Sequence, residues 1–137
     1  MENYVHMQFL SYAQNDKFAR EVAASFIAPA KLDDDRVSDI QTVISEAITN
    51  CVDHAYPQEA GKISMRLELS DAWLRIVIRD YGVGIANIER AREPLFTTGG
   101  DKHSGMGLTI MESFTDTMRV WSQPGKGTRI TMRFRMK

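Results

Sequence analysis

The chain has 137 residues, a formal net charge of -1 and one cysteine, Cys51. With 43% apolar and 26% charged residues, this length predicts one compact domain over residues 1–137 that buries a core without disulfide or metal support. A single cysteine excludes an intrachain disulfide framework and a cysteine-rich zinc site, and it indicates a reducing, cytoplasmic location. Because the sequence has no signal-peptide pattern, no apolar run of membrane-spanning length and no overall positive charge, we expect no export, no membrane insertion and no direct nucleic acid binding.

The N-terminal half predicts one strand and two helices. Apolar residues alternate with polar ones in the first ten positions, which is typical of a strand with one buried face. We expect a first helix with Asn15 as its N-cap, Pro29 at its end, and a core-facing side formed by Phe18, Val22, Ala23 and Phe26. A second helix should follow the aspartates at 33–35, which cap it, and end near Ala55, with a buried side formed by Val37, Ile40, Ile44, Ala47 and Cys51.

The C-terminal half predicts two hairpins separated by a long loop and a helix. Alternating apolar residues from Ile63 to Ile78 indicate the first hairpin, with a turn at 70–71. Residues 82–107 are rich in glycine and predict a loop with one short helical stretch near 88–92, after which Leu108, Met111 and Phe114 mark a helix. The second hairpin turns at 124–125. The predicted fold is an α/β (α+β) two-layer sandwich, with a mixed, mainly antiparallel sheet and helices on one face.

Three polar motifs interrupt this pattern. Glu46 and Asn50 lie one turn apart beside the buried side of the second helix, where a carboxylate suits a general base and an amide oxygen suits Mg²⁺. Asp80 ends a predicted strand before Gly82 and Gly84, so its carboxylate is placed to accept a hydrogen bond from an exocyclic amine. A plainer structure fits each motif alone at least as well: a solvated helix face fits the first motif better, and a glycine turn fits the second.

The third motif is a glycine segment at the start of a predicted helix, formed by Ser104, Gly105, Met106 and Gly107. Free backbone N–H groups and the positive end of the helix dipole converge there, which indicates a phosphate site. The alternative is a flexible loop followed by a helix that Ser104 caps.

The three motifs in this order, followed by Gly127 and Thr128, resemble the N, G1 and G2 boxes of the GHKL ATPases, which include gyrase B, Hsp90, histidine kinases and MutL. Within that superfamily, the segments SEAITN, REPLFTT, SGMGLTIM and GKGT are similar to the small anti-sigma factor serine kinases of spore-forming bacteria. The resemblance extends over essentially the whole chain. It implies a GHKL (Bergerat) fold that binds ATP or ADP with Mg²⁺.

The resemblance also implies roles for individual residues. Glu46 would be the catalytic base, Asn50 the Mg²⁺ ligand and Asp80 the adenine anchor. The remaining ATP-binding residues would be Gly82, Gly84, Thr97, Thr98, Ser104, Gly105, Met106, Gly107 and Thr128. Three positions depart from the family pattern, namely Cys51, Asp53 and Ala55, and the lid is about one residue shorter.

The implied function is that of an anti-sigma factor that phosphorylates a serine of its anti-anti-sigma antagonist. Arg20 on the first helix would contact the sigma factor, and the chain would form a homodimer. An alternative is the catalytic domain of a histidine kinase, which would act in trans because the chain has no long helix with an acceptor histidine.

A binding module without catalysis is a further alternative. Arg129, Arg133 and Arg135 share one face of the last predicted strand, where they also fit a solvated face that discourages aggregation at a sheet edge. Tyr4, Trp73 and Trp121 are expected in the core or an interface, and the numerous methionines are expected to fill the core. The three histidines, His6, His54 and His103, lack metal-ligand spacing, so we assign no metal to them.

Overall fold

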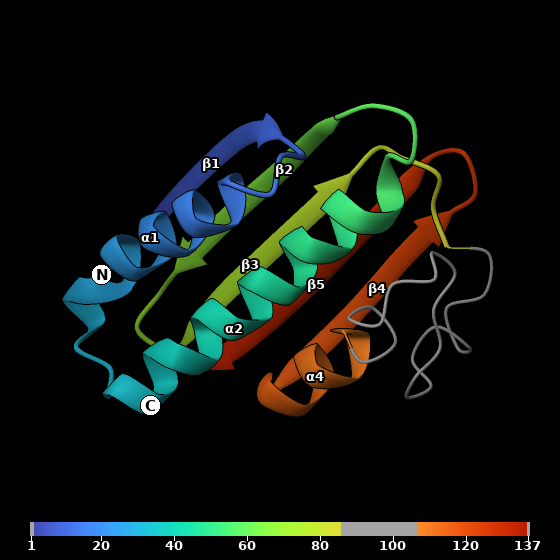
Figure 1. The fold of residues 1–137 in the computed structure, drawn as a ribbon. Coiled ribbons are helices and arrows are strands. Elements are labelled where there is room, and N and C mark those ends of the chain that lie inside the picture. The colour runs from blue at the N-terminus through green and yellow to red at the C-terminus, as the bar shows by residue number, and fades with distance from the viewer. Residues whose placement is uncertain (1, 86–106, 137) are drawn as a thin grey trace.

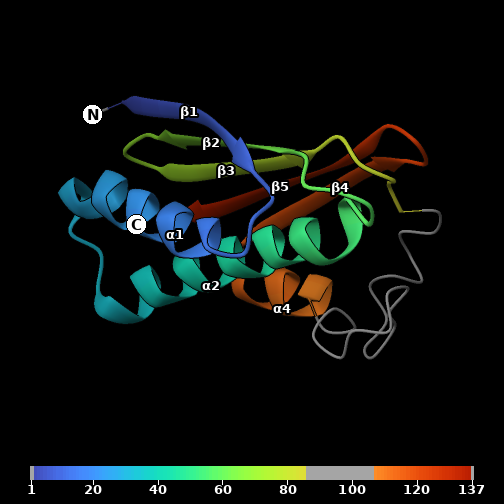
Figure 2. The same ribbon diagram turned by 45° about the horizontal axis from the view of Figure 1, so that its top comes forward.

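A five-stranded antiparallel sheet with helices on one face forms the structure, a computed structural model that describes residues 2–85 and 107–136 (Figures 1 and 2). The strands are β1 (Asn3–Leu10), β2 (Lys62–Leu69), β3 (Trp73–Asp80), β4 (Thr117–Gln123) and β5 (Gly127–Arg135). They lie in the order β1-β2-β3-β5-β4, and every described pairing is antiparallel. The predicted fold class is therefore confirmed.

The helical layer consists of α1 (Asn15–Ile27), α2 (Asp34–Asn50) and α4 (Gly107–Phe114), with two short turns, η1 (Ala28–Ala30) and η2 (Cys51–Ala55). The helices pack on the same side of the sheet, as Figure 2 shows. Their apolar sides and the inner face of the sheet share one core, in which Ile40, Ile44, Met65, Ile76 and Phe134 are fully buried. None of the described helices is long and apolar enough to cross a bilayer.

Helix α2 follows the sequence pattern closely. Asp33 caps it by accepting a hydrogen bond from the Arg36 N–H at 2.8 Å, and its predicted apolar side packs against the core. The helix then continues into η2, a π-helical turn that reaches Ala55, where we expected the helix to end. Single π-helical turns within or at the end of α-helices occur frequently at functional sites.

Helix α1 differs from the prediction in two details. Asn15 is its first residue rather than its cap, and its side chain donates to the Leu10 carbonyl instead. The buried positions are Ala19, Ala23 and Ile27, whereas Phe18 is 49% exposed. Phe18 packs edge-on against Phe9 of the edge strand β1, whereas Phe26 of the same helix packs against the core.

The outer sheet face corrects one further expectation. The last strand, β5, lies between β3 and β4 and is not an edge, so its arginines do not protect a sheet edge. Tyr4 and Trp121 are 66% and 37% exposed, so an interface remains the expectation for these two side chains. Met65 and Met132 are fully buried, as core-filling residues should be.

One polar contact connects the N-terminal end of α2 to the end of the sheet. Asp116 Oδ2 accepts hydrogen bonds from Arg36 Nη2 and from the Arg135 N–H, both at 2.7 Å, and Arg36 Nη2 also donates to the Arg135 carbonyl. These hydrogen bonds, the Arg135 N–H first, hold the pKa of Asp116 below its usual value.

Replacing Asp116 by alanine should lower the free energy of unfolding by about 1–2 kcal/mol at neutral pH, because two hydrogen bonds to a charged acceptor are lost. A carboxylate with a depressed pKa stabilises the fold above its unfolded-state pKa and loses that effect as the pH falls through the folded-state pKa. Urea unfolding should therefore show a difference between wild type and Asp116→Ala that shrinks in acid. A difference of the same size at pH 7 and below pH 3 would contradict this account.

Candidate functional site

The site is organised by Asp80, the last residue of β3. Its partner in the sheet register is Thr128 of β5, whose N–H donates to Asp80 Oδ1 at 3.2 Å. The Gly82 N–H donates to the same oxygen at 3.0 Å. Strand β3, the turn after it and strand β5 thus hold the carboxylate in one orientation.

Asp80 is only 5% exposed, and burial raises the pKa of its carboxyl group. Hydrogen bonds from Gly82, Cys51 and Thr128 oppose that increase, because they stabilise the charged form. The Asp80 carboxylate is therefore an oriented hydrogen-bond acceptor that is shielded from water, which suits recognition of an amine donor.

Cys51 provides the third hydrogen bond to this carboxylate. Its thiol lies 3.6 Å from Asp80 Oδ2, at the beginning of η2 and directly after Asn50. Burial, followed by the charge of Asp80, raises the pKa of the Cys51 thiol well above its usual value, so the group stays protonated and donates. Sequence reasoning treated Cys51 as a departure from the family pattern and missed this contact.

The turn after Asp80 docks onto η2. The Val83 N–H donates to the Ala55 carbonyl at 2.9 Å, and a side chain at Gly82 would overlap the same carbonyl oxygen. Glycine at this position is therefore required by a close approach of two backbone segments. The π-helical turn, which brings the Ala55 carbonyl here, is part of the site.

Ser122 of β4 is a further residue that the sequence did not reveal. It accepts a hydrogen bond from the Ile85 N–H at 2.6 Å, and it lies 2.9 Å from Thr128 Oγ1 and from the Gly127 carbonyl. It therefore connects the turn after β3 with the β4–β5 hairpin. A serine at this position carries no signal in a single sequence.

The second part of the site lies where α2 and α4 meet. A Cβ atom at Gly107 would be 3.0 Å from Asn50 Oδ1, so the first turn of α4 lies directly against the Asn50 amide. Glu46 lies one turn before Asn50 on α2 and is partly buried. The contacts Gly107–Asn50 and Cys51–Asp80 make the two parts of the site continuous.

The structure does not bring all expected site residues together. Thr97, Thr98, Ser104, Gly105 and Met106 lie outside the described residues, as do His103 and the helical stretch expected near 88–92. Gly84 follows the Asp80 turn with a φ of 79°, a conformation that favours glycine.

Arg20 lies on α1, apart from this site, and its backbone carbonyl contacts α2. Its Nε atom is 3.3 Å from Asp16 Oδ1, and its carbonyl accepts a hydrogen bond from Gln41 Nε2. Asp16 in turn accepts from Ser45 Oγ of α2 at 3.0 Å. Arg20 therefore lies at the solvent edge of the α1–α2 interface.

The oxygen atoms of the site fit a Mg²⁺ ion that is held partly by the protein and partly by water and phosphate. Within residues 2–85 and 107–136, no three histidine, cysteine, aspartate or glutamate side chains gather as a protein-only metal site. Mg²⁺ commonly takes one or two protein oxygens and completes its shell with water and phosphate. The Asn50 amide oxygen, with Glu46 one turn away, meets that smaller requirement.

Comparison with known proteins identifies relatives of this arrangement. The family model for a histidine kinase-like ATPase domain matches residues 11–134. Anti-sigma F factors from Caldanaerobacter subterraneus and Bacillus subtilis are each 43% identical to the chain, over 95% and 96% of it and 92% of their own lengths.

Solved structures share the fold at lower identity. The structure of the RsbU and RsbW domains of Rv1364c from Mycobacterium tuberculosis matches 97% of this chain and 32% of that chain, with a TM-score of 0.72 and 20% identity. A histidine kinase domain from Erythrobacter litoralis matches 74% of this chain and 45% of that chain, with a TM-score of 0.57 and 22% identity.

Replacing Cys51 by alanine should raise the pKa of Asp80 further, because the charged carboxylate loses a hydrogen bond. A group with a raised folded-state pKa stabilises the fold below its unfolded-state pKa and loses that effect as the pH rises through the folded-state pKa. Cys51→Ala should therefore destabilise the protein by about 1 kcal/mol more at neutral pH than in acid. Carbon-detected NMR titration of Asp80 measures the pKa directly.

Cys51→Ser is the matched control, since a hydroxyl group can donate to the same oxygen. Its Asp80 titration should remain closer to that of the wild type. An unchanged Asp80 midpoint in Cys51→Ala would mean that the thiol fills space without supporting the carboxylate.

Proposed function

Because the chain belongs to the anti-sigma F factor family and to the histidine kinase-like ATPase domains, we propose that it is an ATP- and Mg²⁺-dependent serine kinase that also inhibits a sigma factor. The observation that carries this proposal is the continuous series of contacts from Asp80 through Cys51 and Asn50 to Gly107. These contacts join a buried carboxylate, which can accept a hydrogen bond, to the start of α4, where backbone N–H groups can bind an anion. ATP has matching groups at its two ends, namely the adenine amine and the phosphates.

At the base end, Asp80 accepts a hydrogen bond from the adenine amine in this proposal. Its Oδ1 atom already has two backbone donors, whereas among the described residues Oδ2 has the weak thiol donor alone, so Oδ2 is the oxygen with free capacity. Thr128, whose N–H donates to the same carboxylate, supports the base through its hydroxyl group, directly or through water. Gly82 and Gly84 let the backbone approach the ring.

At the phosphate end, Asn50 holds Mg²⁺ and Gly107 belongs to the backbone that surrounds the phosphates. The metal ion neutralises charge on the transferred group. Thr97, Thr98, Ser104, Gly105 and Met106 complete the nucleotide site in this proposal.

Glu46 acts as the general base. It accepts the proton of the substrate serine hydroxyl while the serine oxygen forms a bond to the γ-phosphorus and the bond to the ADP oxygen breaks. The products are ADP and a phosphoserine. Because this chemistry depends mainly on positioning and charge, a chain of 137 residues is large enough to perform it.

The biological partners follow from the names of the relatives. We infer that the chain holds a sporulation-type sigma factor inactive and phosphorylates the anti-anti-sigma protein that releases it. A homodimer in the cytoplasm, with residues 1–137 as one kinase domain, completes the proposal.

Two substitutions on α2 separate catalysis from binding. Glu46→Gln should bind ATP as the wild type does but transfer phosphate about a hundredfold more slowly or worse, because the proton acceptor is lost. Asn50→Ala should instead weaken Mg²⁺-dependent nucleotide binding, by about tenfold. Calorimetry with ATP and Mg²⁺, beside single-turnover transfer from labelled ATP to an anti-anti-sigma protein, measures both effects.

Full transfer by Glu46→Gln would show that Glu46 is not the base. The labelled product also distinguishes the alternative kinase class, because phosphohistidine is lost in acid and phosphoserine is not. An acid-labile product would replace the serine kinase by a histidine kinase acting in trans.

The proposed sigma contact rests on Arg20. Arginine is enriched at interface centres, and loss of such an anchor commonly costs about 2 kcal/mol or more. Arg20→Glu should abolish binding of the Bacillus subtilis sigma F factor, used as the trial partner, and leave ATP affinity unchanged. The measurement is a sigma pull-down beside an ATP titration of the same protein.

Lys17→Glu is the matched control on the same helix, since Lys17 is exposed and makes only a long contact of 3.9 Å with Glu21. The repulsion that Arg20→Glu creates with Asp16 is worth a few tenths of a kcal/mol, about the size of an i,i+4 pair, and should not unfold α1. Equal sigma binding by both variants would place the interface elsewhere.

A further inference from the structure

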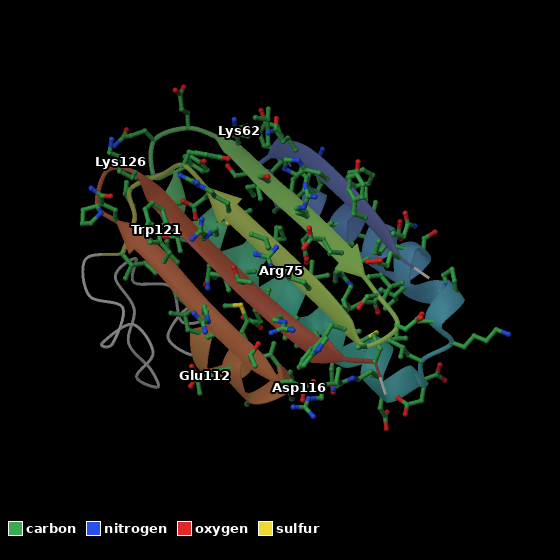
Figure 3. The ribbon with its side chains drawn as sticks, turned by 180° about the vertical axis from the view of Figure 1, so that it is seen from behind. Lys62, Arg75, Glu112, Asp116, Trp121 and Lys126 are labelled. Carbon is green, nitrogen blue, oxygen red and sulfur yellow. The ribbon has the colours of Figure 1, made fainter. Side chains whose placement is uncertain are left out.

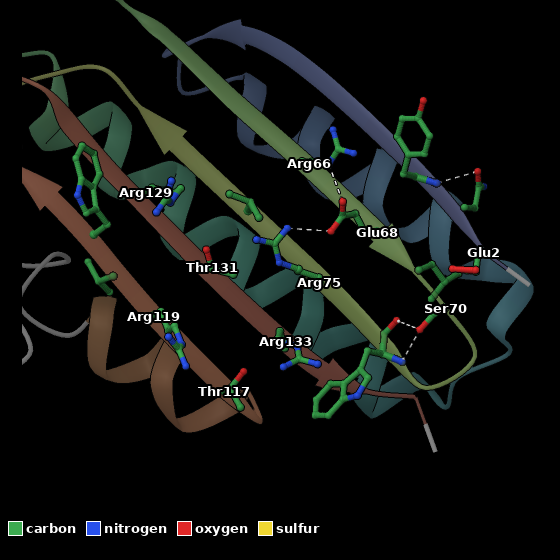
Figure 4. A pocket seen from close by; sticks show the side chains of 17 residues that line it. Glu2, Arg66, Glu68, Ser70, Arg75, Thr117, Arg119, Arg129, Thr131 and Arg133 are labelled. Atoms are coloured by element: carbon green, nitrogen blue, oxygen red, sulfur yellow. Dashed lines mark hydrogen bonds and ion pairs between the residues drawn. The ribbon is translucent and has the colours of Figure 1, made fainter.

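The face of the sheet opposite the helices is lined by arginines. Figures 3 and 4 show this face, on which five arginines come from four neighbouring strands: Arg66, Arg75, Arg119, Arg129 and Arg133. A sixth, Arg79, lies on the same face, because it is opposite Arg129 in the register and is stacked on Trp121. Glu2 and Glu68 are the acidic residues in its lining. With a net charge of -1 for the whole chain, positive charge is concentrated here. We call this surface the arginine face.

Protection of a sheet edge does not account for these charges. Charged residues commonly protect edge strands from aggregation, but β3 and β5 are inner strands of this sheet and carry four of the six arginines. Inner strands have no unpaired backbone to protect.

The arrangement is also unfavourable for the isolated protein. Arg75 lies directly opposite Arg133, and Arg79 lies directly opposite Arg129, in the β3–β5 register. Like charges in such positions destabilise a sheet. A partner that brings negative charge would relieve this repulsion.

Aromatic rings hold several of the guanidinium groups in place. Arg133 lies 4.0 Å from the centre of the Trp73 ring, Arg66 lies 5.0 Å from Tyr4, and Arg129 lies 5.6 Å from Trp121. A guanidinium that is stacked in this way presents its N–H groups with little loss of conformational entropy on binding. Because the guanidinium groups cover the faces of these aromatic rings, the rings are poorly placed to stack with nucleic acid bases.

Glu68 shows which anion fits between these arginines. Its two carboxylate oxygens accept hydrogen bonds from Arg66 Nε at 2.8 Å and from Arg75 Nη1 at 2.9 Å (Figure 4). The register of β4 and β5 repeats this arrangement with a threonine in place of the carboxylate: Arg119 lies opposite Thr131, which stands between Arg129 and Arg133, as Arg75 lies opposite Glu68.

We propose that the arginine face binds an acidic segment of a partner protein, whose carboxylates pair with Arg119, Arg129 and Arg133 of β4 and β5 as Glu68 pairs with Arg66 and Arg75. A second copy of this chain does not suit the face, because two such surfaces would repel one another. The surface is separate from the nucleotide site, so this proposal does not depend on kinase activity.

The test measures binding of a fluorescein-labelled oligo-glutamate peptide to the full chain by fluorescence anisotropy. The double variant Arg129→Gln, Arg133→Gln should bind the peptide about tenfold more weakly, because two charge-assisted pairs are lost. The control Lys17→Gln, Lys31→Asn removes the same charge from the helical side, and asparagine tolerates the positive φ of Lys31. This control should bind as the wild type does.

A second double variant, Arg119→Gln with Arg133→Gln, repeats the test with an arginine of β4, so a folding defect in one variant does not decide the result. Thermal unfolding identifies such a defect. Equal losses in the lysine control and the arginine variants would overturn the proposal, because net charge alone would then explain binding. Tighter binding of an oligothymidylate of equal charge would also overturn it, in favour of a nucleic acid.

Discussion

The hydrogen bonds to the Asp80 carboxylate are the constraint on which the rest of the candidate site depends. They come from Gly82, Thr128 and Cys51, which belong to three segments far apart in the chain. A buried carboxylate without these donors would be strongly destabilising. The turn after β3, the start of β5 and the end of α2 are therefore held in one arrangement by one side chain, and the Ala55–Val83 contact reinforces it.

This constraint explains how the proposed kinase site can be built in so small a protein. Helix α2 carries Glu46 and Asn50 beside the side that Ile40, Ile44 and Ala47 pack against the sheet. The same helix thus holds the core together and orients the polar groups. The π-helical turn then redirects the chain so that Cys51 contacts β3.

Much of the fold was predictable because apolar periodicity records which side of each element is buried. The strands around Ile63–Ile78, the capped helix after Asp33 and the order of elements all appear in the structure. Phe18 and the inner position of β5 were not predictable, since both depend on which strands become neighbours. The Cys51–Asp80 and Asn50–Gly107 contacts were not predictable for the same reason. A single sequence contains the residues of each motif, but it does not show which residues come into contact when the chain folds.

Charge is unevenly distributed between the two layers of the described structure. Exposed aspartates such as Asp34 and Asp35 lie at the start of α2 in the helical layer, whereas the arginine face lies on the other side of the sheet. Within a Debye length, about 10 Å at moderate salt, an approaching charged body experiences a torque as well as an attraction. Partners of opposite charge would be turned toward opposite layers before contact, so two of them could arrive on the same molecule without competing for an approach direction.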